Sequence, residues 1–331
     1  MNFKICAVGC GWMAETGHGP AFKKYKNLHE GICLSACCDL DKKRADAFAE
    51  KFGFERSYTD FKEMLDKERP DAVSLISSVS ATKALALDII KRGYPLIVEK
   101  PPGINAEEAA EIAEAAKVNG VAVRVAFNRR YMPLLRLLKN ELLKNNEHIH
   151  NITYLFVRKG RKDPDFSTTA IHGIDAVRYL AASDYRTIQF EYRQIPGCEA
   201  HVSNICMQCG FHSGTTGQLI FMPMGGGVVE RAVVSLSNST YFLDLPVWGA
   251  VDSPGRLMKI ADNRIEYTIS GDDLPSGNEM FETNGFYAEN ELFFDDLQSG
   301  ADIVSDIESG IQPVDIADCI RNKMKEYKTG E

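Results

Sequence analysis

The chain has 331 residues, of which 44% are hydrophobic and 25% carry a charge. One hydrophobic core seldom grows beyond about 250 to 300 residues, so this length predicts two domains, and the composition is that of a globular protein. The 38 basic and 46 acidic residues give a net charge of −8. This balance argues against nucleic acid as a partner, because proteins that bind it carry an excess of basic residues.

No segment of the sequence meets the requirements for crossing a membrane. The longest stretch without Asp, Glu, Lys or Arg, residues 200–229, is interrupted by Pro223 and by Gly225 to Gly227, whereas a spanning helix needs about 20 apolar residues. The N-terminus lacks the apolar run and the cleavage site of a signal peptide. We therefore expect a cytoplasmic protein with no membrane partner.

Cysteine usage points to a reducing compartment. The nine cysteines are an odd number, and several lie in or beside apolar segments, so we expect buried thiols rather than disulfides. Cys206 and Cys209 form a C-x-x-C pair, but no second pair of Cys or His lies at the spacing of a zinc site. We predict no metal site.

The first part of the chain alternates short apolar runs with amphipathic stretches. Strands that alternate with helices of about 10 to 15 residues indicate βαβ units and a parallel sheet. The predicted strands cover residues 3–8, 31–38, 70–76, 95–98 and 121–126, and the predicted helices cover 14–25, 42–52, 82–92 and 106–118.

The pattern changes after about residue 130, where most segments read as strands without regular helices between them, which indicates a largely antiparallel sheet. We predict an α/β protein in which residues 1–125 form a dinucleotide-type α/β domain with a doubly wound parallel sheet and residues 126–331 form an α+β domain with a largely antiparallel sheet. The predicted strands here cover residues 149–158, 187–194, 200–211, 218–222, 228–237, 240–245 and 256–260, and the predicted helices cover 134–144, 168–182, 285–298 and 314–327.

The first motif with chemical meaning is Gly9-x-Gly11-x-x-Ala14, which follows the first strand and opens a helix. Glycines let the backbone approach a diphosphate closely, and free N–H groups at the helix start bind its charge. Asp39 ends the second strand, where a carboxylate accepts hydrogen bonds from the ribose hydroxyls of an adenosine. The order predicts a dinucleotide site that includes Trp12 and Met13, although a flavodoxin-like fold without a dinucleotide would share the tight turn.

The choice between NAD and NADP depends on the residues around Asp39. Its carboxylate would repel a 2′-phosphate, and Leu40 stands where an NADP enzyme often has arginine or serine. Lys42, Lys43 and Arg44 are close enough to meet a phosphate, or they form a solvated first helical turn. We predict NAD and keep NADP as the alternative.

The second motif, Glu99-Lys100-Pro101-Pro102, follows a predicted core strand. Ligands of parallel sheets bind beyond the carboxyl ends of the strands, so Glu99 and Lys100 are candidates for contact with a nicotinamide. A lysine beside a carboxylate is suited to hydrogen-bonding a reacting hydroxyl. The alternative is a surface salt bridge at a turn.

Together with these two motifs, three more segments make the sequence resemble the glucose-fructose oxidoreductase, inositol dehydrogenase and MocA (Gfo/Idh/MocA) family. They are Phe127-Asn128-Arg129-Arg130, His172-x-x-Asp175 and Gly285-Phe286-Tyr287-Ala288-Glu289-Asn290. The resemblance implies a Rossmann domain, a second domain with an open sheet, NAD or NADP, and a sugar, polyol or related small substrate. It also implies that Lys100 orients the substrate and handles a proton together with His172.

His172 also has a physical case as the general base, because an imidazole with a pKa of about 6.5 accepts and returns a proton near neutral pH. Asp175 lies three residues further along the predicted helix and would orient the ring or bind substrate. The family usually has an aspartate four residues before this histidine, whereas this chain has Thr168, so Thr168 is predicted to bind substrate and Asp163 or Asp165 is a possible substitute.

Five further residues are assigned to the predicted site. Ser77, Ser78 and Thr82 replace residues that touch the cofactor in the family, and we assign them to cofactor binding. Arg129 and Tyr287 are predicted to bind substrate, with an ion pair and core packing as the respective alternatives.

The sequence therefore predicts an NAD(P)-dependent oxidoreductase that moves a hydride between nicotinamide and a sugar-like substrate. A lyase, glycosidase or epimerase that retains its NAD and uses transient oxidation is the first alternative. A non-catalytic dinucleotide-binding sensor is the second. Because an open sheet leaves a face for association, we expect a homodimer or homotetramer formed through the second domain.

Overall fold

The computed structural model describes residues 2–145, 147–300 and 306–329, and the chain divides into two compact units. Unit 1 consists of Met1–Asn128 and Gly285–Val314, and unit 2 consists of Arg129–Asn284 and Asp315–Glu331. The sequence predicted one cut after residue 125. The structure instead returns the segment after residue 284 to unit 1, where helix α9 (Phe286–Ser299) contacts α1 (Gly19–Leu28).

Unit 1 contains a six-stranded sheet in the order β3-β2-β1-β4-β5-β6, and every pairing in it is parallel. This is the strand order of a Rossmann fold, as the sequence predicted. The strands are β1 (Phe3–Val8), β2 (Ile32–Cys38), β3 (Arg56–Tyr58), β4 (Ala72–Leu75), β5 (Leu96–Glu99) and β6 (Val123–Ala126). Besides α1 and α9, the helices are a π-helix (Ala14–His18), α2 (Lys42–Phe52), α3 (Phe61–Glu68), α4 (Val79–Lys91), α5 (Ala106–Asn119) and a short 3₁₀-helix (Ile307–Gly310).

Local sequence explains where several of these helices begin and end. Asp41 accepts hydrogen bonds from Lys43 N and Arg44 N at the start of α2, and Gly53 ends that helix in the left-handed conformation. Asn105 and Gly120 bracket α5 in the same way. A satisfied cap at each end fixes the helix boundaries, and with them the turns at the carboxyl edge of the sheet.

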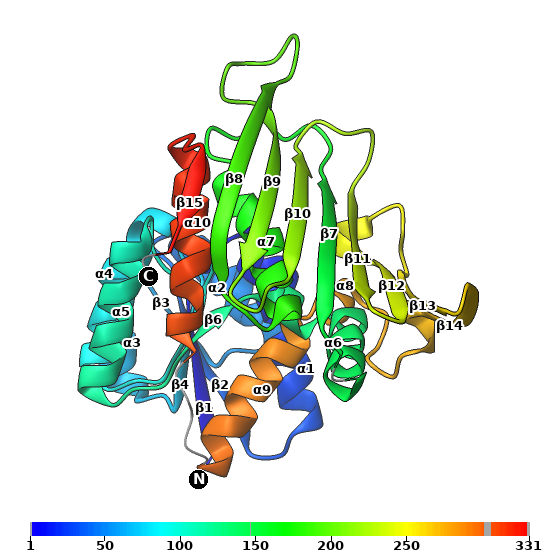
Figure 1. Ribbon diagram of the computed structural model, residues 1–331. Helices are drawn as coiled ribbons and strands as arrows, with labels where there is room; N and C mark the ends of the chain where they lie inside the picture. The colour runs from blue at the N-terminus through cyan, green and yellow to red at the C-terminus, as the bar shows by residue number, and fades with distance from the viewer. Residues whose placement is uncertain (1, 146, 301–305, 330–331) are drawn as a thin grey trace. The chain divides into compact units, whose positions relative to one another are not determined.

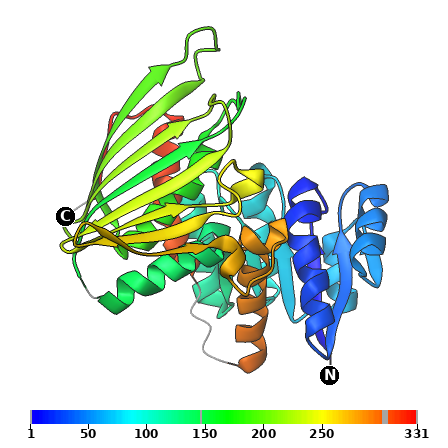
Figure 2. The same cartoon turned by 90° about the vertical axis from the view of Figure 1, so that its right-hand side faces the viewer.

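Unit 2 is built on a nine-stranded sheet in the order β14-β13-β12-β11-β7-β10-β9-β8-β15. All its pairings are antiparallel except the one between β7 and β10. Figures 1 and 2 show these strands, mostly green to yellow, as one twisted layer. The strands are β7 (Ile149–Val157), β8 (Tyr185–Gln194), β9 (Ser203–Phe211), β10 (Thr216–Met222), β11 (Val229–Leu236), β12 (Ser239–Asp244), β13 (Arg256–Ala261), β14 (Arg264–Ser270) and β15 (Glu326–Lys328).

One face of this sheet is covered by helices, and the core of unit 2 lies between the two layers. Buried side chains of α6 (Pro133–Asn145), α7 (Ser167–Ala181) and α10 (Ile311–Arg321) form one cluster with alternate residues of the strands. The remaining helices of the unit are α8 (Met280–Thr283) and 3₁₀-helices at Asn128–Tyr131, Val247–Gly249 and Gly271–Asp273. No helix in the described ranges is long and apolar enough to span a bilayer.

Several elements differ from the sequence prediction. β3, α3, α8 and β14 were not predicted, and the predicted helix over 314–327 ends at Arg321, after which β15 pairs with β8. β3 and β15 have only three residues each, so they carry no measurable period of their own. They are strands because a longer neighbour pairs with them.

A buried ionic cluster ties Arg129, the first residue of unit 2, to the sheet of the same unit. Glu230 on β11 has no exposed surface, and its carboxylate accepts hydrogen bonds from Arg129, Arg158 and Tyr154. Burial alone would raise the pKa of Glu230, but attraction to the two guanidinium groups and these hydrogen bonds lower it to about 2. Arg129 was predicted to bind substrate, and the structure instead gives it the ion pair that was its alternative.

Replacing Glu230 by glutamine is expected to destabilise the protein by about 3 to 5 kcal/mol, because two buried guanidinium groups would lose the carboxylate that they share. Urea unfolding at pH 7 measures this loss. Since the folded-state pKa lies below the ordinary value of about 4.3, the stabilisation is complete above that pH and is lost as the pH falls toward 2.

The matched control is Glu199→Gln, which changes a glutamate of the same unit whose side chain is 75% exposed. It should alter the free energy of unfolding by no more than about 0.5 kcal/mol. Equal stability of the two variants would contradict the importance of the buried cluster.

Candidate active site

The glycine turn after β1 is shaped by one close approach. Gly9 has φ of +97°, and a Cβ at this position would overlap the carbonyl oxygen of Ile76, which follows β4. A Cβ on Gly11 would meet no atom within 4 Å. Gly9 is therefore required by the fold itself, whereas the space beside Gly11 is open to a ligand, as a diphosphate site needs.

A cavity of about 760 Å³ lies at the carboxyl ends of β1, β2 and β4. This volume is in the range of pockets that hold small molecules and cofactors. Its lining includes Gly9, Gly11, Asp39, Ser77 and Ser78, all predicted for the cofactor.

Asp39 is held in place at the edge of this cavity. One carboxylate oxygen accepts from Cys10 N and the other from Asp41 N, each at 2.9 Å. Arg44, a half-exposed side chain that also lines the cavity, lies 3.4 Å from the second oxygen. The carboxylate is thereby fixed where an adenosine ribose would lie, with one cation next to it.

Three other residues predicted for the cofactor have different surroundings. Thr82 is buried, contacts the Ser77 hydroxyl at 3.0 Å and donates to the Ser78 carbonyl, so it supports the cavity wall. Met13 packs against the hydrophobic core of unit 1. Trp12 is 62% exposed, and its contact with a cofactor stays a prediction.

The Glu-Lys-Pro segment follows β5 at the same edge of the sheet. Glu99 is buried, and one of its carboxylate oxygens lies 3.0 Å from Nε2 of His18, so this oxygen faces the protein interior. Burial would raise the pKa of Glu99, but the hydrogen bond from His18 and the charge of Lys100 lower it. Lys100 is half-buried and immediately follows this ionised carboxylate.

His18 is a polar residue of unit 1 that the sequence prediction missed. It sits in the segment Gly17-His18-Gly19-Pro20, where two glycines and a proline interrupt an otherwise helical pattern. Each glycine costs a helix about 1 kcal/mol relative to alanine, so this composition was a signal of unusual local structure. The segment forms the end of a π-helix and the start of α1.

In unit 2, the predicted residues lie on α7. His172 is buried, and Thr168 lies one turn before it on the same face of the helix. Asp175 was predicted to orient the histidine ring or to bind substrate. The structure corrects this, because both of its carboxylate oxygens accept hydrogen bonds from Arg130.

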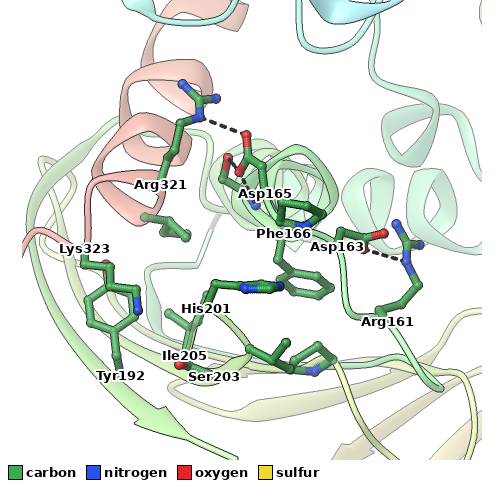
Figure 3. Close-up of a pocket in the computed structure, with 15 residues that line it drawn as sticks. Arg161, Asp163, Asp165, Phe166, Tyr192, His201, Ser203, Ile205, Arg321 and Lys323 are labelled. Carbon is green, nitrogen blue, oxygen red and sulfur yellow. Dashed lines mark hydrogen bonds and ion pairs between the residues drawn. The ribbon is translucent and has the colours of Figure 1, made fainter. Parts of the chain in front are cut away.

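The two carboxylates considered as substitutes for the missing aspartate also form ion pairs with arginines. Asp163 pairs with Arg161, and Asp165 pairs with Arg321 at 2.8 Å. Figure 3 shows both pairs at a pocket near the start of α7. Asp165 also accepts a hydrogen bond from Ser167 N at the start of α7. This contact holds its carboxylate at the helix N-terminus.

Tyr287, predicted to bind substrate, lies on α9 of unit 1. Its hydroxyl donates to Glu291, and Lys24 Nζ lies 4.5 Å from the centre of its ring. These contacts agree with the alternative of packing within the unit, and contact with a substrate stays a prediction. In the described ranges, no group of three or more His, Cys, Asp or Glu side chains is arranged to hold a metal ion.

Residues 3–127 match the family described as GFO_IDH_MocA, oxidoreductase family with an NAD-binding Rossmann fold. Over this domain, the chain is similar to the Gfo/Idh/MocA family. It is 26% identical over 200 residues to an inositol 2-dehydrogenase of Salmonella typhimurium, and 26% identical over 213 residues to one of Burkholderia cenocepacia. These matches cover 57% and 62% of both chains, so this chain matches little more than half the length of these relatives.

Solved structures extend the likeness of fold to the whole chain. A Gfo/Idh/MocA family oxidoreductase from Vibrio cholerae has a TM-score of 0.80 at 21% identity, with 98% of each chain covered. Levoglucosan dehydrogenase in complex with NADH has a TM-score of 0.83 at 18% identity, with 100% of each chain covered. At these identities the likeness establishes the fold of both units and leaves the reaction to be proposed.

The two glycines of the turn should respond differently to alanine. Gly9→Ala places a Cβ on the Ile76 carbonyl at positive φ, so the variant is expected to lose about 1 to 3 kcal/mol of stability. Gly11→Ala should melt like the wild type but bind NADH about tenfold more weakly, because its Cβ projects into the open side of the turn.

Thermal unfolding and an NADH fluorescence titration measure the two effects separately. Gly53→Ala offers a control for positive φ away from the cavity, since a Cβ there meets no atom within 4 Å. Unchanged NADH affinity in Gly11→Ala would argue against a diphosphate at this turn.

Proposed function

We propose that this protein is an NAD-dependent dehydrogenase that oxidises a hydroxyl group, or reduces the corresponding ketone, of a sugar or polyol. The observation that carries the proposal is the cavity behind Gly9 and Gly11, bordered by Asp39, with Lys100 following β5 at the same edge of one parallel sheet. Open space beside Gly11 and a fixed carboxylate match what the adenosine diphosphate half of NAD requires.

The charges at the adenosine end favour NAD over NADP. The Asp39 carboxylate is held by two backbone N–H groups, so it cannot turn away from an incoming 2′-phosphate without losing both hydrogen bonds. Arg44 beside it is partly neutralised by Asp39 and by Asp41. A phosphate would therefore meet a fixed negative charge before it met an available positive one.

The chemical step assigns one task to each of two residues. NAD⁺, when bound, accepts the hydride from the carbinol carbon of the substrate. Lys100 would hydrogen-bond the reacting oxygen and orient it, and His172 would accept the hydroxyl proton as the hydride leaves and return it in the reverse reaction. The electron pair of the broken O–H bond then forms the carbonyl, so atoms and charge balance.

We infer the substrate class from the relatives and from the threonine at position 168. Two of the relatives are inositol 2-dehydrogenases, and the levoglucosan dehydrogenase of similar fold was solved with L-sorbose and with levoglucosan. Thr168 lies one turn before His172 in this chain. Its hydroxyl donates to the Asp165 carbonyl and would accept a hydrogen bond from a substrate hydroxyl without adding charge, which suits a neutral polyol better than a cationic substrate.

We also propose that unit 2 mediates self-association through the face of its sheet opposite the helices. Leu155, Ile220 and Val233 alternate with buried residues on neighbouring strands and remain partly exposed. An open sheet with apolar side chains on its free face is suited to isologous pairing with a second copy.

Lys100→Met and His172→Gln are each expected to lower kcat for polyol oxidation by at least about a hundredfold, because each removes a group that acts on the reacting oxygen. NADH binding should change little in His172→Gln, since His172 is assigned to the substrate. Absorbance of NADH, followed with a panel of sugars and polyols, measures turnover.

His212→Gln is the matched control, because this exposed histidine of unit 2 contacts Thr329 and has no assigned chemistry. Turnover equal to that of the control in both variants would refute the site. Product formation without net NADH would indicate the enzyme class that retains its cofactor, and tight NADH binding with no turnover would indicate a sensor.

Asp39→Asn tests the choice of cofactor. It keeps the shape of the side chain but removes the charge, so the ratio of kcat/KM for NAD to that for NADP is expected to fall about 10- to 100-fold. Arg44→Ser in the same cavity should leave the preference for NAD in place. A wild type that prefers NADP, and loses that preference in Arg44→Ser, would reverse the assignment.

A further inference from the structure

A buried chain of polar contacts lies behind the Glu-Lys-Pro segment of unit 1. The side chain of His18 is 1% exposed and that of Glu99 is 9% exposed, and His18 Nε2 lies 3.0 Å from a Glu99 oxygen. On the other side of the ring, Nδ1 lies 3.1 Å from Nδ2 of Asn290, which is also fully buried. The three residues come from the π-helix, β5 and α9.

The contacts of Asn290 fix the tautomer of His18. Asn290 Nδ2 also donates a hydrogen bond to the carbonyl oxygen of Phe286 at 2.8 Å, which identifies this atom as the amide nitrogen. An amide nitrogen donates, so Nδ1 of His18 must accept. In a neutral ring the proton is then on Nε2, and it is donated to Glu99.

The backbone and packing around His18 hold the ring in this position. The π-helix Ala14–His18 shifts the chain relative to an α-helix, a feature that is rare and often found at functional sites. Phe286 packs edge-on against the imidazole, with ring centres 5.3 Å apart. A Cβ on Gly17 would come within 2.9 Å of the same phenyl ring, so the glycine is needed for this packing.

We propose that His18 is a positioning residue, which keeps the Glu99 carboxylate ionised and correctly placed next to Lys100. The inference builds on the proposed function, because it assigns His18 a role toward the lysine that would orient the substrate. His18 touches neither substrate nor cofactor in this role.

The charges around Glu99 give the physical reason. The groups that act most strongly on it are His18, which lies across the hydrogen bond, and Lys100, which supplies both its charge and its backbone N–H. Burial penalises the ionised form, and these contacts reverse that penalty, so the pKa of Glu99 is lowered. Without the imidazole donor, the balance would move toward a protonated Glu99, and the lysine would lose the negative charge beside it.

The test compares His18→Phe with His18→Gln. Phenylalanine fills the space without a donor, whereas the glutamine amide can place an N–H near the position of Nε2. Neither side chain titrates, so any difference in pH dependence between the two variants reports on Glu99. His29→Gln is the control, because His29 is a partly exposed histidine of the same unit whose Nε2 lies 3.6 Å from Glu291.

The first readout is the pH profile of kcat for the wild type and the variants. In His18→Phe we expect a new acid limb in which kcat falls about tenfold per pH unit below the raised pKa of Glu99, with KM for NAD little changed. His18→Gln should restore the wild-type profile. The same profile in all variants would overturn the proposal.

The second readout is independent of turnover. A buried Glu99 with a raised pKa binds more protons in the folded than in the unfolded protein, so stability falls as the pH rises above the unfolded value of about 4.3. The urea midpoint of His18→Phe should therefore drop relative to His18→Gln between pH 5 and pH 8. Adding Glu99→Gln to both variants should abolish that pH-dependent difference.

The two readouts separate the two proposals. A wild type without dehydrogenase activity, combined with the predicted divergence of urea midpoints, would refute the proposed function while supporting the control of Glu99 by His18. Parallel urea midpoints would refute this role of His18 even in an active enzyme.

Discussion

An ionised carboxylate inside a protein is stable only when donors and positive charge replace the water it has lost. Glu68, Glu99 and Glu230 each meet this requirement with a different set of neighbours. The Glu68 carboxylate accepts hydrogen bonds from Arg56, Ser35 and Tyr58. These contacts lower its pKa to about 2, although burial alone would raise it. Much of the polar interior described above follows from this one constraint.

The constraint also links segments that are distant in sequence. Ser35 on β2 and Arg56 on β3 both bind the last residue of α3, and Arg129 binds a glutamate about a hundred positions away. Such contacts favour one arrangement of the β-strands, because in another register a buried charge would lack its partner. Their contribution is therefore to the uniqueness of the fold as much as to its stability.

The sequence predicted what depends on local pattern. Each strand and helix of the βαβ alternation, and the glycine turn, is encoded by a short run of neighbouring residues, and the structure has the predicted Rossmann order and the mostly antiparallel second sheet. The functions of Arg129 and Asp175 were not predictable in this way. Each is decided by a partner 101 or 45 residues away, and nothing in the local spacing identifies that partner.

His18 illustrates a different limit. Its flanking glycines and Pro20 are visible in the sequence. Its tautomer, however, is set by a contact with Asn290, which is 272 positions away. The predicted helix over 285–298 was correct in position and kind. The sequence pattern did not indicate that this helix belongs to unit 1.

That discontinuity has a consequence for how the chain is made. The ribosome releases residues in order, so β6 and all of unit 2 up to Asn284 are synthesised before the helix that completes unit 1. Until α9 emerges, His18 lacks Phe286 and Asn290, and the hydrophobic core of unit 1 lacks Phe293 and Phe294. Synthesis of the Rossmann unit thus begins first and is completed almost last.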